Sequence, residues 1–352
     1  MKIIYAGVRA ENYNPVRYPS FEYTNFYLQL KAMSGVEIIE YPYDVIVKIG
    51  KERFNKELLE LVYREKPDLF FAFMYSDELN TETLDEIKKK TKSIAWFSDD
   101  QWRIHNYSRL YAPHFTWAVT TWSKAIELYA QYGIKNIIHS QWACNINKWK
   151  PIEGKSINKD IDVSFVGQRT EKRAQVVKEL RKNGIDFYVR GWGWPEGKIS
   201  EEEMVKTILR SKINLNINEP PSLAYWKVLA RLFFKRSAGK IVSDILHIKD
   251  NMKSMLSMGR TPQIKARPFE VLGCRAFLIS GYADDMDHYY ENGKEIVYYD
   301  GTIKDLAAKI RYYLAHGEER EKIAEAGYKR TLRENTYEKR FNDIFKEIGL
   351  SR

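Results

Sequence analysis

The stretch that decides the fold is Ile264-Lys-Ala-Arg-Pro-Phe-Glu-Val-Leu-Gly-Cys-Arg-Ala-Phe-Leu-Ile-Ser-Gly-Tyr282, which leads on to Glu295-Ile-Val-Tyr-Tyr299. Two short apolar runs in it, Ala276–Ser280 and Glu295–Tyr299, have the length and the β-branched or aromatic content of buried strands. Proline suits the first turn of a helix, because the N–H that it lacks would have no partner there. The sequence therefore predicts a helix over Pro268–Cys274, followed by two strands.

Charged residues surround the start of this predicted helix. Glu270 falls in the first turn, where the helix dipole favours a carboxylate, and Lys265 and Arg267 lie just upstream. A carboxylate can accept hydrogen bonds from two ribose hydroxyls, and neighbouring cations can hold a diphosphate. The pattern is typical of a nucleotide-sugar site, although a capped surface helix with ordinary charges would account for Glu270 equally well.

The composition of the whole chain limits its class. A length of 352 residues predicts two domains, each with its own core, and 44% hydrophobic with 30% charged residues is the globular range. The formal net charge of +10 favours acidic partners: nucleotide phosphates, nucleic acid or an anionic membrane surface.

Other features bear on the compartment in which the protein works. The start, Met1–Gly7, indicates a strand and a turn rather than a signal peptide, and no apolar window is long enough to cross a bilayer. The two cysteines, Cys144 and Cys274, have no metal-ligand spacing. We therefore expect a reduced, cytoplasmic protein without a zinc site.

The first half of the chain alternates strand and helix signals. Predicted strands are Lys2–Ala6, Val36–Glu40, Asp68–Met74, Ser93–Phe97, Phe115–Thr120 and Asn136–Ser140, and predicted helices are Phe21–Met33, Phe54–Glu65, Glu82–Lys90 and Ser123–Tyr132. Such alternation predicts a parallel sheet with helices on both faces, and ligands of these sheets bind beyond the carboxyl ends of the strands.

Two carboxylates follow one of these strands directly. Asp99 and Asp100 come after Ser93–Phe97, so they are expected to project into a cleft between the domains. A carboxylate there could deprotonate an acceptor hydroxyl or hold sugar hydroxyls. A helix N-cap or a turn is the structural alternative.

The second half starts a new alternating block after a polar linker. Its predicted strands are Ile161–Gly167, Ile185–Arg190 and Ile213–Ile217, and its predicted helices are Arg173–Asn183, Glu201–Arg210, Ile303–His316, Glu318–Arg333 and Thr336–Ile348. Gly167 turns the chain toward the first helix, whose N-terminus could seat a phosphate with added charge from Arg169 or Arg173. Asn218 follows a strand and is expected to face the same cleft.

A basic insert, residues 220–260, separates this block from the Glu270 segment. From Leu223 to Arg260 it holds eight Lys or Arg against two Asp, interleaved with aromatic and aliphatic residues. A basic amphipathic helix can lie on an anionic membrane, line an acceptor groove or contact nucleic-acid phosphates. A helix packed by its aromatic face, with solvated lysines, is the structural alternative.

Residues 264–335 resemble the donor-binding half of GT-B glycosyltransferases, especially the CgeB-like group. There an Arg-x-Phe-Glu-x-Leu-x-Cys-Gly-x-Phe-Leu pattern precedes Asp-Asp-Leu-x-x-Phe-x-x-Gly-Lys-Glu-Ile. This chain has Arg267-Pro-Phe269-Glu270-Val-Leu-Gly-Cys274-Arg275-Ala-Phe-Leu278, then Asp284-Asp285-Met286 and Gly293-Lys-Glu-Ile296. Arg275 stands where the family usually has Gly, and Pro262 stands eight residues before Glu270, where many retaining relatives have another Glu.

The resemblance implies an α/β fold of the GT-B type, with two Rossmann-like domains facing an interdomain cleft. It places an acceptor-side domain at 1–150, a linker at 151–159, a donor domain at 160–335 that carries the insert 220–260, and at 336–352 a helix that crosses back to the first domain. Trp96-Phe-Ser-Asp99-Asp100 is similar to the Trp-x-x-Asp-Asp that follows the corresponding strand in CgeB-like proteins.

The same resemblance implies a glycosyltransferase that moves a hexose or pentose from a nucleotide-diphosphate sugar, a UDP-sugar first of all, to a hydroxyl. The acceptor would be a saccharide, a surface polymer or hydroxymethylated DNA, which some phage GT-B enzymes glycosylate. No metal cofactor is expected, and Asp285 and Asp287 are expected to cap a helix over Met286–Asn292 rather than to bind a cation.

Each candidate residue then has an expected role. The donor would be bound by Glu270, Lys265, Arg267, Phe269, Gly167, Arg169, Arg173 and Asn218, the catalytic carboxylates would be Asp99 and Asp100, and the acceptor or a polyanion would contact Lys227, Arg231, Lys235 and Arg236. Two alternatives stay open: a non-catalytic nucleic-acid or membrane-surface binding protein on a GT-B scaffold, and an enzyme of the same fold that isomerises nucleotide sugars.

Overall fold

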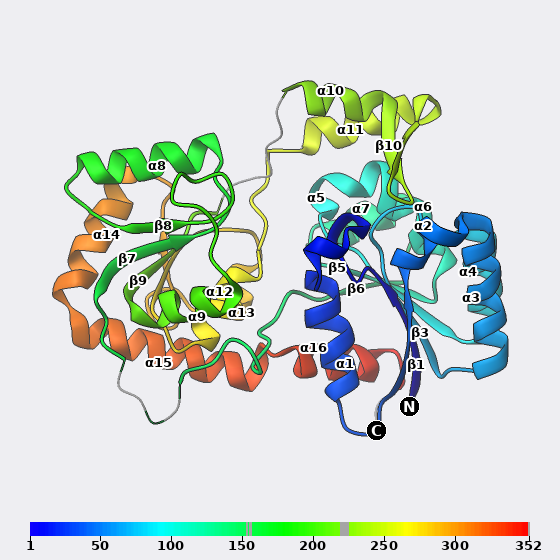
Figure 1. Ribbon diagram of the computed structural model, residues 1–352, viewed down its shortest axis with the longest axis horizontal. Coiled ribbons are helices and arrows are strands. Elements are labelled where there is room, and N and C mark those ends of the chain that lie inside the picture. The colour runs from blue at the N-terminus through cyan, green and yellow to red at the C-terminus, as the bar shows by residue number, and fades with distance from the viewer. Residues whose placement is uncertain (153, 155–156, 219–224, 351–352) are drawn as a thin grey trace. The chain divides into compact units, whose positions relative to one another are not determined.

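The computed structural model describes residues 1–152, 154, 157–218 and 225–350, except for the side chains of residues 225–228 (Figure 1). The chain forms two compact units. Unit 1 consists of Met1–Gln141, Leu223–Arg260 and Arg340–Arg352, and unit 2 of Trp142–Ser222 and Thr261–Lys339. The sequence therefore contributes three separate segments to unit 1 and two to unit 2.

Unit 1 is built on a six-stranded sheet in the order β2-β1-β3-β4-β5-β6, and every neighbouring pair is parallel. Its strands are β1 (Lys2–Gly7), β2 (Glu37–Pro42), β3 (Leu69–Phe73), β4 (Lys92–Trp96), β5 (Trp117–Thr120) and β6 (Ile137–His139). Alternate residues of the central strands pack against opposite layers, as the pleat requires.

Helices cover both faces of this sheet. They are η1 (Glu11–Tyr13), η2 (Pro15–Arg17), the π-helix η3 (Tyr23–Tyr27), α1 (Leu28–Ala32), η4 (Tyr43–Val45), α2 (Ile46–Ile49), α3 (Lys51–Glu65), α4 (Thr81–Lys90), α5 (Asp100–Arg103), the π-helix η5 (Ile104–Ser108), α6 (Arg109–Tyr111), η6 (Ala112–His114) and α7 (Ala125–Gln131). Phe70 of β3 packs in the cluster with α3 and α4. Its neighbour Phe71 contacts Phe26 of η3 on the other face.

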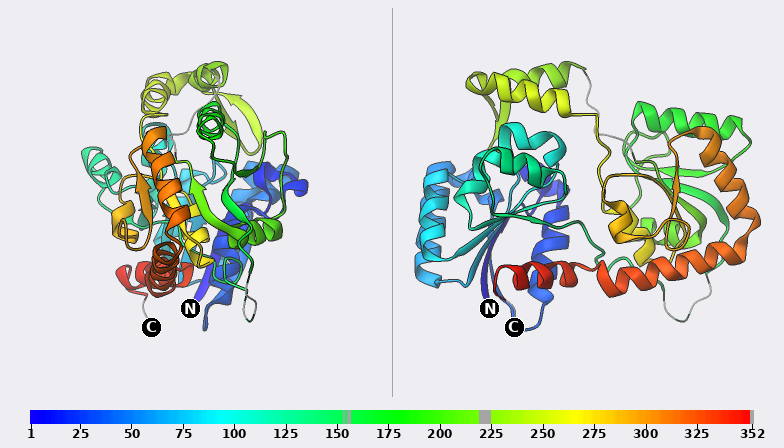
Figure 2. Two further views of the ribbon diagram at one scale, coloured as in Figure 1. Left: turned by 90° about the vertical axis from the view of Figure 1, so that its left-hand side faces the viewer. Right: turned by 180° about the vertical axis from the view of Figure 1, so that it is seen from behind.

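Unit 2 holds a five-stranded parallel sheet in the order β13-β12-β9-β7-β8. Its strands are β7 (Ile161–Val166), β8 (Tyr188–Arg190), β9 (Ser211–Asn216), β12 (Leu278–Gly281) and β13 (Val297–Tyr299). Its helices are α8 (Glu171–Lys182), α9 (Glu201–Arg210), α12 (Arg267–Gly273), α13 (Met286–Tyr289), α14 (Ile303–Ala315) and α15 (Gly317–Glu334), visible from behind in Figure 2.

Two apolar clusters hold the layers of unit 2 together. On one face, Phe277 and Ile279 pack with α8 and α14, and on the other Leu278 packs with α9, α12 and α13. Because strands and helices alternate along both units, the structure confirms the predicted α/β class with two parallel-sheet units. The predicted strands are all present, with ends that differ by at most three residues, and the predicted helix Phe21–Met33 is the pair η3 and α1.

The basic insert departs from the prediction, which gave it to the donor domain. It forms α10 (Tyr225–Phe233), an antiparallel hairpin of β10 (Phe234–Ser237) and β11 (Lys240–Ser243), η7 (Ile245–His247) and α11 (Ile248–Ser257), and it belongs to unit 1. Asp250 of α11 accepts a hydrogen bond from Arg109 at 2.6 Å, and Asn106 donates to Asn251 at 2.8 Å. These polar contacts, which link residues far apart in the sequence, hold the insert on unit 1.

The last helix, α16 (Tyr337–Glu347), begins in unit 2 and enters unit 1 at Arg340. The ring of its Phe341 lies 5.7 Å from that of Phe26 and 6.1 Å from that of Phe71, measured between centroids. The C-terminal segment thus completes one of the two helical layers of unit 1.

Arg275 adopts a backbone conformation that favours glycine. It follows α12 with a φ of 55°, in the left-handed region where helices commonly end, and its side chain is ion-paired with Glu325 of α15. The glycine that the resembling family has here is thus accounted for by the end of a helix rather than by an approach of the backbone to a ligand.

We predict that Arg275→Gly unfolds at a higher urea concentration than Arg275→Ala. Both variants lose the ion pair with Glu325, so the comparison isolates the left-handed backbone, which costs a residue with a Cβ about 1 kcal/mol. Equal free energies of unfolding for the two variants would show that the backbone at this position is not strained.

Candidate functional site

The predicted donor residues lie at one edge of the unit 2 sheet. Because its strands are all parallel, their carboxyl ends share this edge, and the segments that follow β7, β9 and β12 meet there. Helix α12 leads into β12 and therefore has its first turn at the same edge. Topology thus brings the loop after Gly167, the residue Asn218 and the start of α12 to one side of the sheet.

The loop after β7 is fixed by the loop after β8. Gly167 N–H donates to the carbonyl of Arg190 at 2.9 Å, and Trp194 Nε1 donates to the carbonyl of Gly167 at 2.9 Å. A Cβ on Gly191, whose φ is 139°, would lie 2.1 Å from that same carbonyl oxygen. Only glycine allows the two loops to approach this closely.

Arg173 joins the loop after β7 to the end of β9. Its Nε and Nη2 donate to the carbonyl of Ile217 at 3.2 and 3.1 Å, and its Nη1 donates to the carbonyl of Gln168 at 2.9 Å. Its own N–H donates to Oγ1 of Thr170, the N-cap of α8, at 3.2 Å. Arg173 therefore positions the loop, and the first turn of α8 directs its N–H groups toward the sheet edge, where an anion would be favoured.

Asn218 lies between the ends of β9 and β12. Its Nδ2 donates to the carbonyl of Tyr282 at 3.5 Å, and Gly281 leaves room for it, since a Cβ there would come within 3.1 Å of the Asn218 Cβ. Its Oδ1 is buried and has no hydrogen-bond partner among the described residues. A buried acceptor in this state suits a donor group of a ligand.

Arg169 precedes the N-cap of α8, and its side chain is partly exposed. It is ion-paired with Glu171 at 2.9 Å, and its guanidinium lies 6.0 Å from the centre of the Trp194 ring. An exposed pair of this kind is worth little in stability, so the guanidinium can turn toward a bound anion at small cost.

Glu270 is buried in the first turn of α12. Its Oε2 lies 2.8 Å from Nη1 of Arg267, and the Arg267 guanidinium lies 5.9 Å from the centre of the Trp149 ring. Burial raises the pKa of Glu270, the positive charges of Arg267 and Lys148 oppose this rise, and the negative charge of Glu201 adds to it. Arg267 therefore favours the ionised carboxylate, and Oε1 carries no hydrogen bond among the described residues.

Two other residues near this turn have different surroundings. Lys265 donates a hydrogen bond to the side chain of Gln263. Phe269, predicted to bind the donor, is fully buried, and its ring packs against those of Tyr289 and Tyr290 at 5.7 and 5.6 Å between centroids. Phe269 is thus part of the core of unit 2, and its contact with the donor stays a prediction.

Sequence reasoning missed residues that shape the site from other segments. Lys148 and Trp149 surround the Arg267–Glu270 pair but belong to a stretch that the sequence marks only as a connector. Trp194 supports the loop after β7. The sequence feature that could have indicated this role of Trp194 is the unusual run Gly191-Trp-Gly-Trp-Pro195 directly after a strand.

The two carboxylates that follow β4 in unit 1 differ sharply in environment. Asp100 is fully buried, and Tyr129 donates to its Oδ2 at 3.1 Å. Burial raises its pKa to about 6, while the hydroxyls of Ser108, Thr120 and Tyr129 act against this rise. The carboxylate of Asp100 therefore faces the interior of unit 1, and its catalytic role stays a prediction.

Asp99 is half-buried at the N-cap position of α5, with a φ of 65° and without a side-chain capping hydrogen bond. Loss of solvent lowers the pKa of Arg231, the charge of Arg103 lowers it further, and the carboxylate of Asp99 opposes them. The carboxylate of Asp99 therefore lies near the guanidinium of Arg231.

The cations predicted to contact an acceptor or a polyanion are turned toward unit 1. Arg231 lies 5.1 Å from the centre of the Trp102 ring, Lys235 lies 3.6 Å from Asp244, and Arg236 donates to Asn12. Lys227 belongs to α10, but its side chain is outside the described residues.

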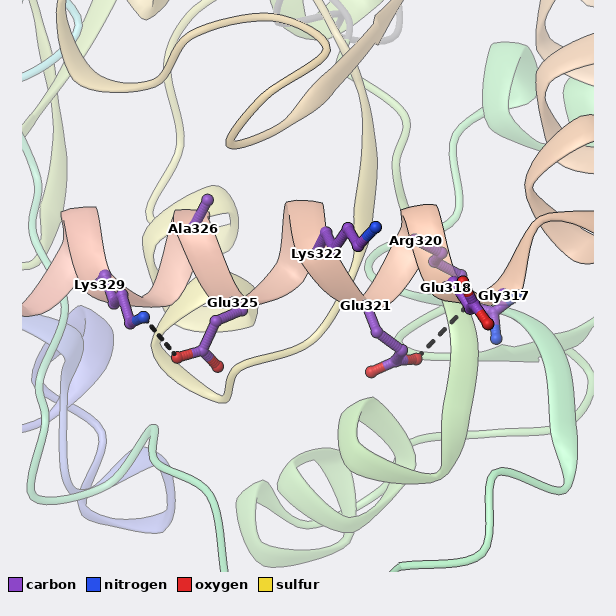
Figure 3. Close-up of a pocket in the computed structure, with 8 residues that line it drawn as sticks. All are labelled: Gly317, Glu318, Arg320, Glu321, Lys322, Glu325, Ala326 and Lys329. Carbon is purple, nitrogen blue, oxygen red and sulfur yellow. Dashed lines mark ion pairs between the residues drawn. The ribbon is translucent and has the colours of Figure 1, made fainter.

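Unit 2 has surface hollows along α15 and beside the start of α9. One follows the outer side of α15, where Lys329 lies 3.3 Å from Glu325 and Arg320 lies 3.7 Å from Glu321 (Figure 3). Another is lined by Lys148, Glu201 and neighbouring residues. Neither contains a predicted donor residue, and the neutralised charges along α15 give no sign of a ligand.

The described residues contain neither a metal-binding cluster nor a membrane-spanning helix. In the ranges that the structure covers, no group of three or more His, Cys, Asp or Glu residues is arranged to hold a metal ion. Within the same ranges, every helix is too short or too polar to span a membrane.

Comparisons with known proteins bear on the whole chain. A family model described as glycosyl transferase-like matches residues 169–346. A comparison with curated proteins finds no match.

Solved structures with the same fold include enzymes of sugar transfer. Sucrose-phosphate synthase from Thermosynechococcus elongatus aligns with a TM-score of 0.60 at 8% identity, covering 99% of each chain. A glycosyltransferase from Rickettsia africae aligns at 0.59 and 12%, covering 99% of this chain and 98% of that one. HepE from Anabaena in complex with UDP aligns at 0.57 and 9%, covering 99% and 100%. At these identities the likeness concerns the fold.

We predict that Asp100→Asn folds and becomes more stable, relative to the unaltered protein, as the pH rises from 4.5 to 7. The folded pKa of about 6 exceeds the ordinary value of 3.8, so the folded state holds the proton longer and the unaltered protein loses stability through this range. Asparagine does not ionise. Urea unfolding measures the free energy of unfolding of each protein. The difference between the two free energies should change by about 2 kcal/mol between pH 4.5 and pH 7.

Asp186→Asn serves as the control, because Asp186 is exposed in unit 2. The comparison separates the effect of the buried carboxyl from the change of net charge that both substitutions bring. A difference that does not change with pH for Asp100→Asn would contradict the burial of the Asp100 carboxyl.

Proposed function

Since the chain belongs to the glycosyl transferase-like family, whose model spans residues 169–346, and has the GT-B fold, we propose that it transfers a sugar from a nucleotide-diphosphate sugar to a hydroxyl acceptor. The observation that carries this proposal is the edge of the unit 2 sheet. There the loop after Gly167, held by Arg173, and the ion-paired Glu270 of α12 offer anion-binding and hydroxyl-binding groups at the ends of parallel strands.

We propose UDP as the nucleotide of the donor. HepE, which shares the fold, has been solved in complex with UDP and with UDP-glucose. A diphosphate needs N–H donors and positive charge, and the first turn of α8 together with Arg169 and Lys265 supplies both.

During the reaction, negative charge develops on the leaving nucleotide diphosphate. The bond between the anomeric carbon and the diphosphate oxygen breaks, its electron pair stays on the nucleotide diphosphate, and the acceptor oxygen bonds the anomeric carbon as it loses its proton. Fixed N–H groups and cations that face the diphosphate lower the barrier, because its negative charge grows in the transition state. Protein groups supply the countercharge in this reaction, which then needs no metal ion.

Glu270 would accept hydrogen bonds from ribose hydroxyls. Arg267 lies at Oε2, where its positive charge opposes the rise in the pKa of Glu270 that burial causes, and Oε1 is left as an acceptor. An ionised acceptor forms stronger hydrogen bonds than a neutral amide oxygen does. Lys148 and Trp149 would limit the freedom of this pair.

On unit 1, we propose Asp99 as the carboxylate that accepts the proton of the acceptor hydroxyl, since Asp100 is buried. Arg231 and Arg236 would contact the acceptor, which we expect to be a saccharide, a surface polymer or hydroxymethylated DNA. A positive surface near the acceptor favours a substrate with negative charge.

We predict that Glu270→Gln lowers kcat/KM for the donor by about 30-fold or more, because a hydrogen bond to a charged group contributes about 2 kcal/mol. The assay incubates the protein with UDP-, GDP-, ADP-, CMP- and dTDP-sugars and measures released nucleotide, with and without EDTA. One donor, a UDP-sugar, should be turned over, and EDTA should leave the rate unchanged.

Glu202→Gln is the matched control, because Glu202 is an exposed residue of α9, and it should behave as the unaltered protein. Unchanged turnover in Glu270→Gln would remove Glu270 from the donor site. An epimerised nucleotide sugar without free nucleotide would favour an isomerase. If none of the nucleotide sugars reacts, the result would favour a binding protein.

A further inference from the structure

The two helices of the insert lie side by side on unit 1, with α11 placed against α5 and η5 (Figures 1 and 2). The side of α11 that faces them is polar: Asn251 and Ser254 are buried there, and Asn251 donates to the carboxylate of Asp244 at 3.0 Å. An amphipathic helix ordinarily packs through its apolar side. Helix α11 packs on unit 1 through its polar side instead.

The outer side of α11 is consequently rich in large apolar residues. Met252 and Leu256, one helical turn apart, are 48% and 52% exposed, and Ile245 and Leu246 in the turn before α11 are 62% and 95% exposed. Single exposed apolar residues are common, but a group of them on one short segment marks an interaction surface.

The same segment carries positive charge without compensation. Lys249, Lys253 and Arg260 are exposed, and no ion pair joins them to a carboxylate within the described residues. Both acidic residues of the insert are engaged elsewhere: Asp250 with Arg109 at 2.6 Å, and Asp244 with His247 and Asn251. The outer side of α11 thus combines apolar side chains with cations only.

The combination of exposed apolar side chains and cations fits a lipid surface better than a nucleic acid. Phosphate backbones are bound by cations and hydrogen-bond donors, which leave exposed leucine and methionine without a role. At a bilayer, apolar side chains enter the boundary of the acyl chains while lysines remain at anionic headgroups. The hairpin cations, by contrast, contact other segments of unit 1: Lys235 lies 3.9 Å from Asp77, and Arg236 donates to Asn12.

We propose that α11 and the turn before it dock unit 1 onto an anionic membrane surface, with Leu246, Met252 and Leu256 entering the headgroup region and Lys249 and Lys253 binding anionic lipids. The segment lies on the surface of the bilayer and does not cross it. This docking is independent of the donor chemistry of unit 2.

The test measures sedimentation of the full chain with vesicles of phosphatidylcholine alone and of phosphatidylcholine with phosphatidylglycerol. Two variants probe the surface: Leu246→Ser/Leu256→Ser and Lys249→Glu/Lys253→Glu. Two controls on unit 1 carry the same changes at other exposed positions: Val16→Ser/Val47→Ser and Lys48→Glu/Lys135→Glu. Thermal unfolding checks that all variants fold.

The unaltered protein and both controls should bind the anionic vesicles, and each α11 variant should bind them at least about ten-fold more weakly. Binding should weaken with salt, since exposed charges are screened. Absence of binding to anionic vesicles would overturn the proposal, as would equal binding by the α11 variants. Salt-sensitive binding to duplex DNA without any to vesicles would overturn it in favour of a nucleic-acid surface.

Discussion

Parallel strand pairing is the constraint on which the rest of this structure depends. In a parallel sheet each carboxyl end falls at one edge, so residues that follow different strands meet although the sequence separates them widely. In unit 2 this brings the loop after Gly167 to Ile217 and Asn218, and Arg173 fixes the arrangement by donating to carbonyls of both segments. Gly191 allows the neighbouring loop to close in from β8. The anion-binding N–H groups of α8 are therefore held in place before any ligand arrives.

Electrostatics then separate the roles of carboxylates that look alike in sequence. Burial raises the pKa of Glu270, and the guanidinium of Arg267 beside it opposes this rise in favour of the charged form that a hydroxyl-binding role requires. Asp100 is buried among hydroxyls with a raised pKa and serves unit 1 as an internal hydrogen-bond acceptor. Asp99, its neighbour, keeps contact with solvent and faces Arg231. Burial and the nearest charge therefore decide which carboxylate can act on a substrate.

The sequence predicted the strands and most helices because buried parallel strands are short apolar runs between turn residues, as at Ile161–Gly167. It did not reveal that Phe269 faces the core, since a helix of seven residues gives too little periodicity to orient it. The hairpin β10–β11 was missed because its charged strands continue the pattern of the helix before it. The insert is held in place by the contacts Arg109–Asp250 and Asn106–Asn251. These residues are far apart in the sequence, so no local pattern predicts the contacts.

The central claim is that the nucleotide diphosphate binds at the strand ends of unit 2, and hydrogen–deuterium exchange with saturating UDP tests it most directly. The account predicts slower exchange in two stretches, 167–173 and 265–271, because the diphosphate would occupy the N–H groups at the start of α8 and the ribose would rest on Glu270 of α12. The strand ends of unit 1, including Asp99–Arg103, should exchange as before. Protection confined to unit 1, or none in either unit 2 stretch, would contradict the account.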